Sequence, residues 1–154
     1  MTTSHIVSSL PMTLAVLAAG ASLFTASMTE AAPRARHEKS SRVRITIGSN
    51  VFNATLSDSG TAKAFKAMLP LTVNMSELNA NEKHAHLPGD LPRKDANPGT
   101  IHSGDLMLYG SNTLVLFYNT FSTSYSYTRI GKVDDVTGLA AALGSWDVTV
   151  TFEL

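Results

Sequence analysis

The segment LMLYGSNTLVLFY, residues 106–118, decides the fold class. Residues 106–109 and 114–118 are short runs of Leu, Val, Met and aromatic side chains, a composition typical of β-strands. Residues 110–112 between them read as a turn, because Gly and Asn tolerate a positive φ. Both runs are apolar at every position instead of at alternate ones, which predicts strands buried on both faces.

Alternation of apolar and polar residues predicts further strands on both sides of this segment. The full predicted set covers residues 43–47, 51–56, 71–76, 82–87, 106–109, 114–118, 125–130 and 148–153. Most connections between them are short, which favours antiparallel pairing. The sequence therefore predicts a mostly-β chain with about eight strands in a closed or nearly closed β-barrel, because closure leaves no exposed strand edge.

Two short helices are predicted between the strands. Residues 57–59 offer a helix cap, and Phe65 and Met68 then lie on one helical face until Pro70 prevents continuation. The second helix covers residues 138–144, where an alanine-rich run lies between two glycines. Both helices have the length expected of plugs at the ends of a barrel.

The N-terminal segment differs from the rest of the chain. Residues 12–24 are apolar and uncharged, and the run is too short to span a bilayer comfortably. Small residues follow, so we expect a signal peptide over residues 1–31 with cleavage near Ala31 or Ala32. The segment before the apolar run has no Lys or Arg, which leaves an uncleaved membrane anchor or a different start codon as alternatives.

Signal cleavage implies an exported protein, periplasmic or secreted, without stable membrane insertion. Residues 32–41 are basic and lack apolar periodicity, so they are expected to form a flexible linker. Residues 42–154 are expected to form a single domain, and the 44% hydrophobic composition suffices for one core.

Composition removes several classes of function. The 12 basic and 12 acidic residues cancel, so no nucleic-acid partner is expected. The chain has no cysteine, which excludes disulfides, thiolate catalysis and zinc–cysteine sites. Neither a Gly-x-Ser-x-Gly elbow nor a phosphate-binding glycine loop occurs, and no cofactor is expected.

Two histidines are candidates for metal binding, and one aspartate is a candidate for either a metal site or a turn. His84 and His86 are two apart, so on a strand they share a face and could offer two imidazoles to a metal. A third ligand would have to come from His102 or Asp105, and solvent-facing histidines beside a loop are favoured over a metal site. Gly104 and Asp105 are expected to form a tight entry into a strand, with the carboxylate capping backbone amides.

Three segments taken together resemble the cyclophilin-like family of small bacterial proteins. They are TAKAF (61–65) with MLP (68–70), GDL (104–106) with YG (109–110), and LVLFY (114–118) followed by SYTRIG (126–131). The match covers roughly residues 42–154. The resemblance implies a barrel of about eight strands with capping helices, which agrees with the strand pattern.

The resemblance also frames the functional expectation. A cyclophilin-type prolyl isomerase needs a cationic donor over an apolar proline pocket. The Phe-His-Arg stretch that carries this donor in cyclophilins is not found, and Arg129 between aromatic residues is the best stand-in.

The first hypothesis is therefore a module that binds a peptide segment or a small-molecule ligand, with no catalytic residue assigned. Its expected ligand-binding residues are Arg129, Tyr109, Phe117, Tyr127, Glu82 and His86. The alternatives are a prolyl isomerase of the cell envelope that uses Arg129, and a metal-dependent hydrolase that uses His84 and His86.

Overall fold

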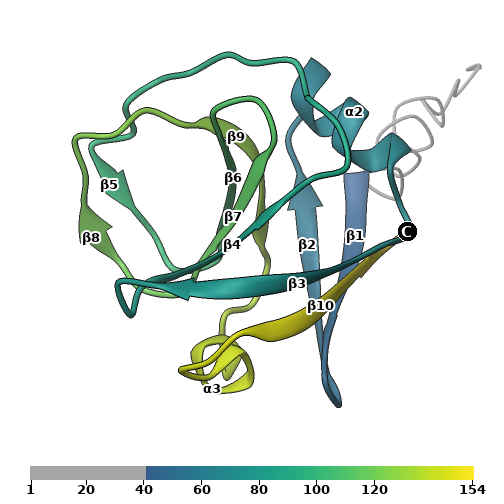
Figure 1. The fold of residues 1–154 in the computed structure, drawn as a ribbon, viewed down its shortest axis with the longest axis vertical. Helices are drawn as coiled ribbons and strands as arrows, with labels where there is room; N and C mark the ends of the chain where they lie inside the picture. Colours follow the sequence, from purple (N-terminus) through teal and green to yellow (C-terminus); the bar gives the residue numbers. More distant parts are fainter. Residues whose placement is uncertain (1–40) are drawn as a thin grey trace, which may run out of the picture.

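The fold is a closed antiparallel β-barrel, seen in a computed structural model that describes residues 41–154 (Figure 1). Its strands are β1 (Arg42–Ile47), β2 (Asn50–Leu56), β3 (Leu71–Leu78), β4 (Glu82–His86), β6 (Asp105–Tyr109), β7 (Thr113–Phe117), β9 (Thr128–Val133) and β10 (Val148–Glu153). They follow the order β1-β10-β3-β4-β7-β6-β9-β2 around the barrel. The predicted mostly-β barrel is confirmed. The predicted signal peptide and all but the last residue of the predicted linker lie outside the described residues.

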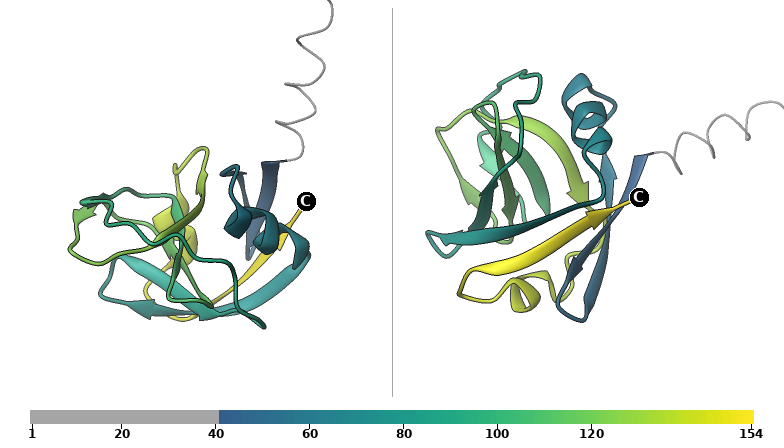
Figure 2. Two further views of the ribbon diagram at one scale, coloured as in Figure 1. Left: turned by 90° about the horizontal axis from the view of Figure 1, so that it is seen from above. Right: turned by 45° about the vertical axis from the view of Figure 1, so that its right-hand side comes forward.

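The barrel closes through pairs of strands that are distant in the sequence. Ile45 of β1 lies opposite Phe152 of β10, so the two ends of the domain are neighbours, and Figure 2 shows the C-terminus beside the start of β1. On the other side β2 pairs with β9, where Gly131 lies opposite Leu56. A Cβ atom at Gly131 would come within 2.6 Å of the carbonyl oxygen of Thr55. Only glycine allows the two backbones to approach this closely.

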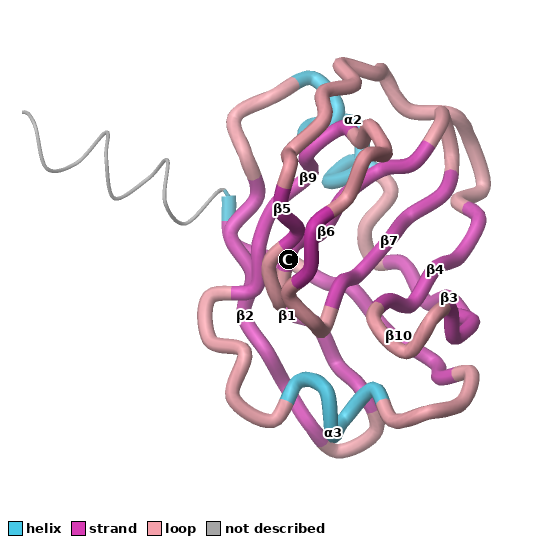
Figure 3. Tube along the Cα trace, turned by 90° about the vertical axis from the view of Figure 1, so that its left-hand side faces the viewer, coloured by secondary structure: helices cyan, strands magenta, loops and turns pink. Residues whose placement is uncertain are grey.

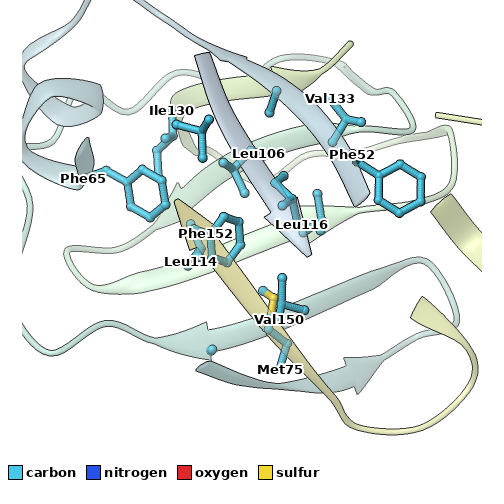
Figure 4. Close-up of a cluster of buried hydrophobic side chains, with 14 of the residues drawn as sticks. Phe52, Phe65, Met75, Leu106, Leu114, Leu116, Ile130, Val133, Val150 and Phe152 are labelled. Atoms are coloured by element: carbon cyan, nitrogen blue, oxygen red, sulfur yellow. The ribbon is translucent and has the colours of Figure 1, made fainter. Parts of the chain in front are cut away.

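The two predicted helices are confirmed as α2 (Gly60–Ala67) and α3 (Leu139–Leu143), which lie at opposite ends of the barrel (Figure 3). The hydroxyl of Ser59 caps α2 by accepting a hydrogen bond from the amide of Ala62 at 3.1 Å. Phe65 of α2 is fully buried, and its ring meets Phe152 edge-on with 5.6 Å between centroids (Figure 4). Leu139 and Leu143 of α3 are buried in the same core.

Strands β6 and β7 are buried on both faces, as their sequences predict. Their leucines point into the barrel core, whereas Met107, Val115 and Phe117 belong to a second apolar cluster. This outer cluster consists of Ile101, Met107, Val115, Phe117 and Tyr127, with the partly buried Phe121 packed against it. A small sheet of β5 (Thr100–Ile101) and β8 (Phe121–Ser122) contributes to it and lies outside the barrel (Figure 1). Two residues are too few for alternation to predict a strand.

One predicted strand boundary is wrong. Strand β9 begins at Thr128, three residues later than the predicted start at Tyr125. Tyr127 instead exchanges two backbone hydrogen bonds with Ala96, of 2.9 and 3.0 Å, outside the barrel. The alternating tyrosines there mark a segment that crosses the outer cluster. We call residues 121–127 the outer segment.

The expected role of Asp105 in the turn before β6 is confirmed. Its carboxylate accepts a hydrogen bond from the backbone amide of His102 at 2.9 Å, which closes the turn at the entry to the strand. Neither helix in residues 41–154 has the length and apolar character needed to cross a membrane.

Candidate ligand pocket on the outer face of the barrel

A pocket of about 540 Å³ lies on the outer face of the barrel, beside the outer segment. Its floor comes from alternate residues of two adjacent strands: Glu82, His84 and His86 of β4, and Thr113 and Val115 of β7. Alternate residues share a face of a strand, so these side chains point outward while those between them point inward. The turn before β4, the end of β6 and the outer segment complete the lining.

The wall of the pocket is aromatic. Tyr109 at the end of β6 lies 6.3 Å from Tyr125 and 5.7 Å from Tyr127, measured between ring centroids. Tyr127 in turn packs edge-on against Phe117 at 5.4 Å. Phe117 also contacts Phe121, with 5.8 Å between centroids. The rings therefore form one continuous series of contacts from the buried outer cluster to the exposed rim. These contacts hold the wall in place.

Glu82 is the unusual group of the floor. Its side chain lines the pocket, yet the residue is only 9% exposed. Within residues 41–154 its carboxyl makes no hydrogen bond or ion pair. Burial, followed by the negative charge of Glu77, raises the pKa of Glu82 to about 7. Near neutral pH the carboxyl is therefore poised between its two protonation states, with no protein partner for either.

Lys83, the residue next to Glu82 in sequence, pairs with a second acidic group, Glu77, and not with Glu82. Glu77 accepts a hydrogen bond from the hydroxyl of Tyr118 at 2.8 Å and forms an ion pair with Lys83. The ammonium of Lys83 also donates to the carbonyl oxygen of Trp146 at 2.8 Å. Burial alone would raise the pKa of Glu77, but the hydrogen bonds from Lys83 and Tyr118 and the charge of Lys83 lower it. Glu77 is thus negatively charged and forms its ion pair with Lys83.

The same surroundings act on the tyrosine nearest the floor. Burial, and next the charge of Glu82, raise the pKa of Tyr127, so its phenol stays protonated at physiological pH. Tyr109 and Tyr125 are more open, with 47% and 62% of their surface exposed. The wall therefore presents neutral aromatic faces with hydroxyl groups at the rim.

Four of the six residues expected to bind a ligand line this pocket. They are Glu82, His86, Tyr109 and Tyr127. Phe117 lies beneath the wall in the outer cluster. Arg129 does not belong to the lining. Its guanidinium donates to the carboxylate of Asp105 at 3.1 Å, and its role in ligand binding stays a prediction.

Sequence analysis missed the outer segment as a part of the site. Phe121, Tyr125 and residues 122–124 all line the pocket, but the pattern of alternating tyrosines was interpreted as a barrel strand. The polar run at 122–124, which breaks the alternation before Tyr125, is the signal that could have separated this segment from β9.

The histidines do not form a metal centre with the expected third ligand. His84 and His86 share the pocket, and the imidazole of His86 lies 3.3 Å from the hydroxyl of Thr113. The ring of His102 instead lies 3.9 Å from the carboxylate of Asp105. In the described part of the chain, no three His, Cys, Asp or Glu side chains are grouped as metal ligands. The hydrolase alternative therefore gains no support.

Comparison with known proteins agrees with this architecture. The family model described as the Cyclophilin-like family matches residues 45–153. Among solved structures, a hypothetical protein from Archaeoglobus fulgidus, determined in solution, is 18% identical with a TM-score of 0.48, over 73% of this chain and 92% of that chain. No curated protein matches the sequence. Because the family match spans nearly the whole barrel and well over half of the chain, the chain belongs to the Cyclophilin-like family.

Proposed function

We propose that this protein is an exported binding module that holds a small molecule or a short peptide segment in the pocket on the outer face of the barrel. The observation that carries the proposal is the pocket itself, a cavity of about 540 Å³ that combines an aromatic wall with polar side chains from β4, β7 and residues 122–124. Ligand sites have volumes in this range, with aromatic rings for apolar contact and polar groups that fix the orientation of the ligand.

The environment of Arg129 favours binding over prolyl isomerisation. An isomerase of the cyclophilin type requires a cationic donor directed at the substrate amide. The Nη1 of Arg129 donates to the carboxylate of Asp105, which is 1% exposed, and Arg129 does not line the pocket. Within residues 41–154 the pocket lining contains neither Lys nor Arg. A fold shared with an enzyme family does not carry the activity with it.

The location outside the cytoplasm rests on the sequence of the N-terminal segment, an uncharged apolar run at residues 12–24 followed by small residues. N-terminal sequencing of the mature protein tests it. A first residue at position 32 or 33 is the expected result, and an intact Met1 in the protein from cells would contradict export with cleavage.

The binding function is tested by NMR with the full chain and a set of small aromatic, amine and dipeptide compounds. We expect some of them to shift the amide signals of pocket residues such as Thr113 and Thr123. Thr113→Trp should abolish these shifts, because the indole fills the floor. Thr149→Trp is the matched control, since Thr149 is an exposed strand residue outside the lining.

Two results would count against the proposal. Binding that survives Thr113→Trp, or that shifts only signals remote from the pocket, would overturn the site. An Ala-Pro peptide whose cis/trans exchange is accelerated by the protein would replace the binding module with an isomerase.

A further inference from the structure

The pocket presents an unpaired acid to its ligand. Residue Glu82 is 9% exposed and lines the pocket, and within residues 41–154 its carboxyl has no hydrogen-bond donor or cation as a partner. Buried carboxyls in folded proteins are nearly always paired, because an unpaired one sacrifices its interactions with water. Since residues 41–154 supply no partner, a bound ligand is the natural source of one.

We propose that the pocket takes the ammonium group of an organic cation, with Glu82 as its counter-ion and the rings of Tyr109, Tyr125 and Tyr127 beside it. This inference rests on the proposed binding function and names its ligand class. A cation supplies the counter-charge that Glu82 lacks, whereas an anion would be repelled and a neutral apolar ligand would bury the carboxyl further.

The aromatic wall independently fits the same ligand class. The faces of aromatic rings attract cations through their quadrupole, and cages of tyrosines with an acidic residue are a recurring solution for ammonium groups. The ring of Tyr109 lies 6.3 Å from that of Tyr125 and 5.7 Å from that of Tyr127, measured between centroids. Phe121 adds a further ring to the lining.

The lysines and arginines of residues 41–154 do not line the pocket. Lys83, adjacent to Glu82 in sequence, points to the other face of β4 and is held by Glu77 and by the carbonyl of Trp146. The bases of the lining are His84 and His86, on the same strand face as Glu82.

Ligand binding should therefore be coupled to proton release. Glu77 of β3, Tyr118 beyond β7 and Tyr127 of the outer segment surround Glu82, and Glu77 is the charged group among them. A bound cation favours the ionised form of Glu82, which at pH 6 has to lose a proton first. The affinity for a cation should consequently rise between pH 6 and pH 8.

The test compares choline with 3,3-dimethyl-1-butanol, a molecule of the same shape without the charge. NMR titrations with the full chain at pH 8 should give choline an affinity about tenfold or more above that of the alcohol, with shifts at pocket residues. Glu82→Gln should remove this preference, while Glu153→Gln, which alters an exposed glutamate outside the lining, should keep it. The pH dependence of wild-type binding supplies the same information should Glu82→Gln fail to fold.

The possible results separate the two proposals. Equal affinities for choline and the alcohol, or an affinity for choline that does not depend on Glu82 or on pH, would overturn the cation proposal and leave the binding pocket intact. Absence of binding by either probe and by every neutral compound would overturn both. Tighter binding of Nα-acetyl-lysine methylamide than of choline would support the cation and assign it to a peptide lysine, and the reverse order would assign it to a small quaternary ammonium compound.

Discussion

Lys83 and Glu77 form an ion pair at the end of the β3–β4 hairpin, in which the lysine side chain is 0% exposed and the glutamate side chain 21%. The pair has further polar partners, since Tyr118 donates to Glu77 and Lys83 donates to the carbonyl of Trp146. A buried pair of this kind stabilises the folded state less than its geometry suggests. Loss of one partner, however, leaves the other charge buried without a counter-ion.

Glu77→Gln is therefore expected to lower the free energy of unfolding by about 3 kcal/mol, because the ammonium of Lys83 stays buried without its counter-ion. The double variant with Lys83→Met should recover most of the loss. Urea denaturation measures both. Lys63→Met is the control: its exposed pair with Asp58, at 2.9 Å, should be worth less than about 1 kcal/mol. A Glu77→Gln effect no larger than that of the control would contradict the interpretation.

The arrangement of Glu77 and Lys83 also illustrates what the sequence could predict. Alternation in β4 places Lys83 and Glu82 on opposite faces, and this pattern was read correctly as a strand. The partners of each face depend on which strands are neighbours around the barrel, namely β3 and β7 for β4. These pairings follow from closure over the whole chain, and no local pattern encodes them.

The same limit explains which parts of the pocket were predicted. Glu82, His86, Tyr109 and Tyr127 are expected from the sequence to bind a ligand, and all four line the pocket; amphipathic rings such as those of the tyrosines suit a ligand groove. Tyr125 was assigned to a strand because alternating tyrosines fit a half-buried sheet as well as they fit a wall over an outer cluster. Only the packing of Tyr127 on Phe117 distinguishes the two.

The raised pKa of Glu82 predicts a specific dependence of stability on pH. Its ordinary value of 4.5 applies to the unfolded chain, and in the folded protein burial and the charge of Glu77 raise it to about 7. Between these values the folded state holds a proton that the unfolded state has lost, so stability falls as the pH rises and the penalty is complete above pH 7. Glu82→Gln removes this penalty and should gain up to about 3 kcal/mol over wild type from pH 4 to pH 8.

Guanidinium denaturation of wild type and Glu82→Gln at pH 4, 6 and 8 checks this sign. The difference between the two proteins isolates Glu82 from the other ionisable groups, which are the same in both. A difference that stays constant over this range, or that turns in favour of wild type at high pH, would show that the carboxyl has a partner in the folded protein.

Phe117 is expected to hold the wall of the pocket through the outer cluster. Phe117→Leu should cost roughly 1–2 kcal/mol, and it should also loosen the outer segment because the contacts with Phe121 and Tyr127 are lost. Phe152→Leu, in the inner core, is the matched control, since both rings are fully buried. Hydrogen exchange should accelerate selectively at residues 121–127 in the first variant only. Equal acceleration in both variants would mean that the inner core, and not the outer cluster, positions the wall.

Arg129 tests whether the isomerase alternative has a structural basis. Its partner Asp105 is 1% exposed and keeps only the amide of His102 as a close hydrogen-bond donor when the guanidinium is removed. Arg129→Ala should therefore lower the free energy of unfolding by about 1–3 kcal/mol and leave the affinity of pocket ligands unchanged. Arg129→Lys, which keeps the charge, should lose less stability. A variant that keeps its stability but loses ligand affinity, or slows the exchange of an Ala-Pro peptide, would instead return Arg129 to the binding site. In that case Asp105 would position the guanidinium for its ligand, and the outer pocket would be only one part of a longer groove.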